Sequence, residues 1–165
     1  MSAAADTTAP TRRSKTLAAW LAFLGGTLGL HRFYLHGLRD AWGWVLVLPT
    51  LLGLVGVDRM YTLGQNDPVA WLLVPILGIT ISIAMLSAIV IALTPDEKWD
   101  IRFNPAGPPS ATGWGPVLAA IVSMLIGGAA LMGTIAFGGQ KFFEWQLEDK
   151  VASTTPGTQI NIVWR

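Results

Sequence analysis

The stretch PVAWLLVPILGITISIAMLSAIVIALTP, residues 68–95, contains no charged side chain. A helix needs about 20 consecutive apolar residues to cross the hydrocarbon core of a membrane, and this stretch is longer than that. The whole chain of 165 residues is 52% hydrophobic and only 13% charged. Soluble domains carry about 25% charged residues, so a chain this poor in charge cannot cover a globular surface with groups that water solvates. We therefore predict an integral membrane protein of the all-α class.

Three more apolar stretches lie at residues 16–30, 41–57 and 115–139. The last is long enough to span a membrane, the second is marginal, and the first is long enough only if HRFYL continues its helix. On this basis we predict four transmembrane helices. The predicted segments are a disordered basic tail (1–14), a helical hairpin (15–62), a third transmembrane helix (68–95), an extracytoplasmic loop (96–113), a fourth transmembrane helix (114–140) and a cytoplasmic amphipathic segment with a tail (141–165).

The distribution of lysine and arginine predicts the orientation, because cytoplasmic loops carry an excess of these residues. With the N-terminus in the cytoplasm, four spans place seven of them inside: Arg12, Arg13, Lys15, Arg59, Lys141, Lys150 and Arg165. The four on the other side are Arg32, Arg39, Lys98 and Arg102. We therefore expect both termini to be cytoplasmic, in a bacterial cytoplasmic (inner) membrane.

Composition excludes several kinds of function. The chain has no cysteine, which removes disulfides, thiolate catalysis and cysteine-type zinc sites, and its net charge of +1 gives no reason to expect a nucleic-acid partner. His31 and His36 point to different faces of a helix, whereas a helical metal pair uses a spacing of three or four. No serine, histidine and carboxylate form a recognisable hydrolytic arrangement. We predict no enzyme activity, no catalytic residue, no metal and no cofactor.

Small residues recur at helical spacing in the apolar stretches. In membranes such residues let helices approach closely, because lipid gives little hydrophobic drive between helices. One interpretation is that they pack the helices of this chain, and the other is that they form grooves for a partner or a second copy. The residues are Gly25 and Gly29, then Ala84, Ala88 and Ala92, then Ala119, Ser123 and Gly127.

The first apolar stretch ends in GGTLGLHRFYLHG, residues 25–37. Arg32 and Arg39 can extend toward lipid phosphates, while Phe33 and Tyr34 suit the membrane interface. Gly37 precedes a short turn into the next apolar stretch. The pattern indicates a tight polar corner at the membrane–water boundary.

These residues also carry a family resemblance. KTLAAWLAFLGGTLGLHRFYLHG resembles the signature of the TM-2 domain family, small membrane proteins with two helices and a connection, and the resemblance covers about residues 15–62. The matching residues are Gly26, Gly29, His31, Arg32, Phe33, Tyr34, Leu35 and Gly37. The chain departs from the pattern at His36, which precedes the glycine, and at Met60, which follows Asp58 and Arg59. The resemblance implies a membrane hairpin but no defined biochemical activity.

Asp58 resembles the family's later aspartate and lies near the end of the second apolar stretch. A carboxylate there is costly in lipid unless it is paired. In an antiparallel hairpin the end of the second helix returns to the start of the first, so we predict an ion pair between Lys15 and Asp58. A proton relay is the alternative role for this carboxylate.

Three functions remain open. The first is a structural or interaction module that binds membrane lipid, another membrane protein or a second copy of itself, with the corner and the small-residue grooves as its contact surfaces. The alternative is a small oligomeric transporter or channel subunit, with Pro49, Pro75 and hydroxyl side chains along a polar path. An intramembrane enzyme is the third, and it requires converging titratable groups that the sequence does not supply.

Overall fold

The computed structural model describes residues 12–154. Most of the predicted N-terminal tail and the end of the predicted C-terminal tail lie outside the described residues. Every element in the described part of the chain is a helix, which confirms the all-α prediction. The elements are α1 (Lys15–Gly25), the 3-10 turn η1 (Gly26–Leu28), α2 (Leu30–His36), α3 (Ala41–Leu63), α4 (Pro68–Leu93), α5 (Asp96–Phe103) and α6 (Gly115–Thr154).

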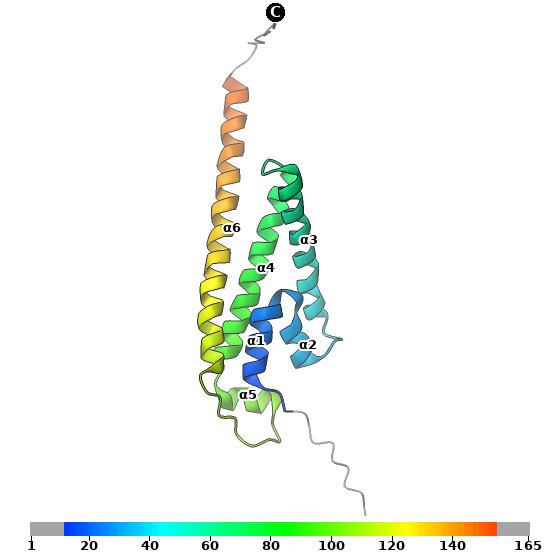
Figure 1. Ribbon diagram of the computed structural model, residues 1–165, viewed down its shortest axis with the longest axis vertical. Coiled ribbons are helices and arrows are strands. Elements are labelled where there is room, and N and C mark those ends of the chain that lie inside the picture. Colours follow the sequence, from blue (N-terminus) through cyan, green and yellow to red (C-terminus); the bar gives the residue numbers. More distant parts are fainter. Residues whose placement is uncertain (1–11, 155–165) are drawn as a thin grey trace, which may run out of the picture.

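Three of the described helices, α3, α4 and α6, are long and apolar enough to cross a membrane. They run along the long axis of the molecule, with α4 packed against both others (Figure 1). Aspartates cap two of them: the Asp40 carboxylate accepts from the Trp42 amide at 3.2 Å, and the Asp67 carboxylate accepts from the Ala70 amide at 2.8 Å. Such caps satisfy amides that have no partner within the helix. These apolar helices fit the predicted membrane protein.

The first apolar stretch does not form a helix of spanning length. α1 has 11 residues, which extend about 16 Å, roughly half of a hydrocarbon core. The chain then turns through η1 and Gly29, whose φ of 71° lies in the left-handed region. α2 returns to the end at which α1 begins, so both lie near α5 (Figure 1). The turn at Gly29 is the reason that the structure has three helices of spanning length where the sequence predicted four.

The segments that follow α4 also differ from the sequence prediction. The predicted loop at 96–113 contains the two-turn helix α5. The predicted division at residue 140 is not present, because α6 runs without a break over 40 residues and extends beyond the α3–α4 turn (Figure 1). No proline or helix-ending turn interrupts α6 over residues 117–154, so backbone hydrogen bonding continues through the polar residues.

Small residues lie where the helices approach each other. A Cβ on Gly127 of α6 would lie 2.7 Å from the Met85 Cβ of α4, and one on Gly26 would lie 2.8 Å from the Ala84 Cβ. The other predicted packing residues are buried as well: Gly25, Gly29, Ala88, Ala92, Ala119 and Ser123. These small residues are therefore buried within the described part of the chain.

Candidate functional site

A side chain of α3 forms a hydrogen bond to the break between α1 and α2. A helix break at membrane depth leaves backbone carbonyls that water does not reach, and each needs a partner from the protein. The hydroxyl of Thr50, a buried residue of α3, lies 2.7 Å from the Thr27 carbonyl oxygen in η1. It also lies 2.8 Å from the Leu46 carbonyl of its own helix. Thr50 thus supplies a donor at the point where the chain turns.

α2 lies directly on α3. A Cβ on Gly29 would overlap the backbone of Gly43, and a Cβ on Gly43 would overlap the ring of Phe33. The Phe33 ring then contacts the Trp44 ring, with centroids 5.2 Å apart. The glycines let the two backbones approach closely, and the two rings cover that contact. The orientation of α2 is therefore set by packing against the first turn of α3.

An ion pair closes the turn between α2 and α3. The Arg32 Nε donates to the Asp40 carboxylate at 2.7 Å, and the His36 ring lies 3.8 Å from the same carboxylate. The hydrogen bond from Arg32 lowers the pKa of Asp40 below its usual value. Because Asp40 also caps α3, one carboxylate joins the end of α2 to the start of α3.

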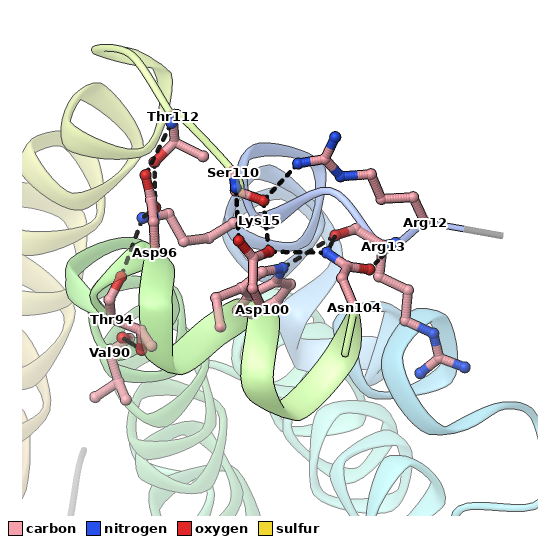
Figure 2. A network of polar contacts seen from close by, with 11 residues as sticks. Arg12, Arg13, Lys15, Val90, Thr94, Asp96, Asp100, Asn104, Ser110 and Thr112 are labelled. Atoms are coloured by element: carbon pink, nitrogen blue, oxygen red, sulfur yellow. Dashed lines mark hydrogen bonds and ion pairs between the residues drawn. The ribbon is translucent and has the colours of Figure 1, made fainter. Parts of the chain in front are cut away.

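An ion pair and hydrogen bonds join the start of α5 to the start of α1 (Figure 2). The Lys15 ammonium donates to the Asp96 carboxylate and, at 3.0 Å, to the Thr94 carbonyl oxygen. Thr112 donates to Asp96 from its amide at 2.9 Å and from its hydroxyl at 2.5 Å. The hydrogen bonds from Lys15 and Thr112 lower the pKa of Asp96 to about 2. The carboxylate therefore stays ionised at any physiological pH.

A second carboxylate organises the loop after α5. Asp100 accepts hydrogen bonds from the amide and the hydroxyl of Ser110, both at 2.6 Å, and these lower its pKa. Asn104 donates to it at 3.3 Å, and Arg12 donates to the Ser110 hydroxyl at 2.7 Å (Figure 2). The proline- and glycine-rich loop is thereby tied to α5.

Residues 12–14 belong to the same network, so the predicted disordered tail is ordered there. The Arg13 carbonyl accepts from the Trp99 indole N–H at 3.0 Å and from the Asn104 side chain at 3.1 Å. Its amide donates to the Asn104 side-chain oxygen at 2.9 Å. The Ser14 amide donates to the Tyr34 hydroxyl at 2.9 Å, which joins this segment to α2. We call the whole assembly of residues 12–15, 29–40 and 94–114 the corner.

The corner contains a cavity of about 380 Å³ between α2, α4 and α5, which we call the corner cavity. The lining contributed by α2 and α5 mixes basic side chains with apolar and aromatic ones, and the lining contributed by α4 is mainly apolar. The lining residues are His31, Arg32, Leu35, His36, Leu86, Ser87, Val90, Ile91, Thr94, Lys98, Trp99, Arg102 and Phe103. None of these lining residues is acidic. The cavity therefore combines an apolar wall with a net positive charge.

The structure brings most of the signature residues into the corner. His31 and Leu35 are buried and line the cavity, and burial lowers the pKa of His31 to about 4. The His31 Nδ1 has no hydrogen-bond partner in the described part of the protein. Phe33 packs on α3, and the Tyr34 hydroxyl accepts a hydrogen bond from the Ser14 amide. Gly26 and Gly29 form the turn, and Gly37 ends α2 with a φ of 86°.

The predicted ion pair between Lys15 and Asp58 is not formed. Lys15 binds Asp96 at the corner, whereas Asp58 lies on the last two turns of α3, next to the α3–α4 turn. The neighbouring Arg59 binds Asp67 with two hydrogen bonds of 2.8 and 2.9 Å. The prediction assumed a full-length first helix. Because α1 and α2 fold back, the start of α1 and the end of α3 lie at opposite ends of the molecule (Figure 1).

Sequence reasoning missed α5 and its partners. Asp96, Trp99, Asp100 and Asn104 hold the corner together, yet their segment was read as a surface loop. The acidic pair at Asp96 and Glu97, immediately after Pro95, is a helix-start signal that could have found it. The partners of these residues could not have been found, because Arg13 and Lys15 lie more than 80 residues earlier.

The described residues include no cluster with the ligands of a metal site. No group of three or more histidine, cysteine or acidic side chains within residues 12–154 could hold a metal ion. Two further cavities of about 280 and 420 Å³ lie along α4 and α6, and their lining residues include no ionisable side chain. The corner cavity instead places basic side chains beside an apolar wall.

Comparisons with known proteins add no assignment: no protein-family model, no curated protein and no solved structure matches this chain.

Proposed function

We propose that this chain is a non-enzymatic multi-pass membrane module of the TM-2 type, which holds the corner at one membrane surface as a binding site for another membrane component. The observation that carries the proposal is the contrast between the corner and the spans. The corner is fixed by ion pairs and hydrogen bonds from α1, α2, α5 and the following loop. The spans carry almost no ionisable groups: within α4 and residues 115–140 of α6 there are none.

That contrast favours binding over transport. Transport paths and proton relays in membranes are marked by ionisable residues inside the bundle. The cavities along α4 and α6 lack such residues. Pro49 and Pro75 lie inside α3 and α4, and the cavity beside Pro75 is lined mainly by apolar residues.

The proposed orientation places the corner in the cytoplasm. Three spans put the two ends of the described chain on opposite sides, so only one of them can be cytoplasmic. At the corner end lie seven described basic residues: Arg12, Arg13, Lys15, Arg32, Arg39, Lys98 and Arg102. At the other end lie three: Arg59, Lys141 and Lys150. The excess at the corner supports a cytoplasmic N-terminal end and an external C-terminal end.

Photo-crosslinking in living cells tests the module. A photoreactive residue at Leu38, which is 72% exposed in the α2–α3 turn, probes the corner, and one at Leu63, which is 61% exposed at the other end, is the matched control. We expect reproducible capture of lipid or of one membrane protein from position 38 and much less from position 63. Equal capture from both positions would contradict a binding role for the corner.

A flux measurement tests the alternative function. Purified protein in sealed liposomes should leave the permeability to protons, potassium and chloride at the level of empty liposomes. Flux that scales with the amount of protein would replace the module by the transporter or channel. Reporter fusions at residue 12 and after residue 154 test the orientation, with opposite sides expected.

A further inference from the structure

The corner cavity has the chemistry of a site for a charged amphiphile. Part of its lining comes from α2 and α5. Lys98 and Arg102 of α5 are exposed and make no ion pair within the described residues. Arg32 adds a third cation, although Asp40 neutralises it. Since no lining residue is acidic, the positive charge is not compensated inside the cavity.

The opposite wall is apolar and open to the side of the bundle. Leu86 and Val90 of α4 line the cavity and are 59% and 60% exposed. Leu86 lies eight residues before Thr94, so this wall extends about 12 Å along α4 from the polar end. That direction leads from the membrane surface toward the hydrocarbon core. A soluble anion would make no use of such a wall, whereas an acyl chain would cover it.

One buried polar atom of α2, near the cavity, has no hydrogen-bond partner in the described residues. The His31 Nδ1 is buried without a hydrogen-bond partner, although His31 is only 4% exposed. This nitrogen lies beneath the cavity surface and out of reach of water, so the contacts to a ligand come from the cations and the apolar wall.

We infer that the corner cavity binds one phosphate-bearing anionic lipid, with the phosphate among the cations of α2 and α5 and the acyl chains along Leu86 and Val90. The inference rests on the proposed function and names the component that the corner binds. A phosphate accepts charge-assisted hydrogen bonds from lysine and arginine, which are stronger than neutral ones. The cavity volume lies at the lower end of the range for small-molecule sites, which suits a headgroup with the first part of its chains.

Native mass spectrometry of the full chain in detergent tests the inference. The probes are short-chain phosphatidylglycerol, phosphatidylcholine with the same chains, and inorganic phosphate. We expect one phosphatidylglycerol to be retained per chain at concentrations where phosphatidylcholine is not. Equal retention of both lipids would overturn the inference, as would displacement of the lipid by inorganic phosphate at equal concentration, because the apolar wall would then contribute nothing.

Charge-matched variants locate the site. Lys98→Gln and Arg102→Gln remove cavity cations, and Arg39→Gln removes an exposed cation at the same end of the molecule that does not line the cavity. Loss of a charge-assisted hydrogen bond should weaken phosphatidylglycerol binding by about tenfold in each cavity variant, whereas Arg39→Gln should leave it within twofold (about 0.4 kcal/mol). Equal weakening by all three would overturn the cavity as the site.

The result is separable from the proposed function. Absence of lipid selectivity, with no liposome flux and with specific capture from position 38, would reject the lipid and retain the module. Liposome flux would reject the module whatever lipid the cavity binds. Since Lys98 and Arg102 are exposed and outside the ion-pair network, the variants should keep the melting temperature of the native chain.

Discussion

The Lys15 ammonium and the Asp96 carboxylate bind each other across 81 positions of sequence. Lys15 is 6% exposed and Asp96 is 28% exposed, so the pair lies at the edge of the packed region. It joins the first turn of α1 to the first turn of α5, and Thr112 completes the coordination of the carboxylate (Figure 2). The start of α1 and the helix α5, which follows α4, therefore form one structural unit.

This pair makes the stability of the corner dependent on pH. The pKa of Asp96 is lowered from 3.8 to about 2, so its contribution is fully present above about pH 4 and is lost as the pH falls toward 2. We expect Asp96→Asn to lower the stability by about 1–2 kcal/mol at pH 7, a value reduced by the partial exposure of the pair. The difference between the native chain and the variant in detergent melting temperature should shrink between pH 4 and pH 2. A difference that stays constant down to pH 2 would show that the carboxylate charge is not what stabilises the corner.

The donor at the helix break gives a second prediction. Thr50→Val keeps the shape of the side chain but leaves the Thr27 carbonyl without its hydroxyl partner, which should cost about 1 kcal/mol or more. Thr80→Val is the matched control. Thr80 is also buried, but its hydroxyl donates only to the Ile76 carbonyl of its own helix, at 2.7 Å. Melting curves of both variants in the same detergent should show a loss for position 50 and little change for position 80. The role of Thr50 would be wrong if the two behaved alike.

Gly29 combines two constraints that can be separated. Its φ of 71° is unfavourable for other residues by about 1–2 kcal/mol, and a Cβ would also overlap the backbone of Gly43. Gly37 has a φ of 86° but open space around its Cβ position, so Gly37→Ala introduces backbone strain alone, of about 1–3 kcal/mol. We expect Gly37→Ala to yield a folded protein with a lower melting temperature, and Gly29→Ala to yield little folded protein on size-exclusion chromatography. Comparable recovery would mean that α2 and α3 separate easily.

The packing of α4 on α6 gives a fourth prediction. Gly127→Ala forces a new methyl group against the Met85 Cβ, where the available distance is 2.7 Å, and overpacking of this kind costs about 1–3 kcal/mol. Gly128→Ala adds the same methyl group one position later, where nothing lies within 4 Å. It should be neutral or slightly stabilising, because alanine is the better helix former. Thermal unfolding in detergent should separate the two variants; a stabilised Gly127→Ala would show that the helices are not in close contact there.

Much of the fold follows from local patterns. The long uncharged runs predict helices in lipid, and the apolar stretches predicted to begin at residues 41 and 68 do begin α3 and α4 there. Small residues at spacing four predict close contacts, and the structure buries them. The signature stretch at residues 25–37 also predicts a corner, but it does not predict that α5 and the following loop pack against that corner. α5 escaped prediction because a short polar helix has little hydrophobic periodicity, and its stability comes from distant partners.

The amino-acid sequence by itself determined that this chain belongs in lipid and where α3 and α4 begin, because length, apolar character and capping are local properties. Only the tertiary structure decided that the first apolar stretch folds back at Gly29 instead of crossing. That outcome depends on Gly43 leaving room for the turn and on Thr50 supplying a hydrogen bond to it. The tertiary structure also decided that Lys15 pairs with Asp96 and not with Asp58. The direction of α1 and α2 determines which end of the molecule each charge reaches.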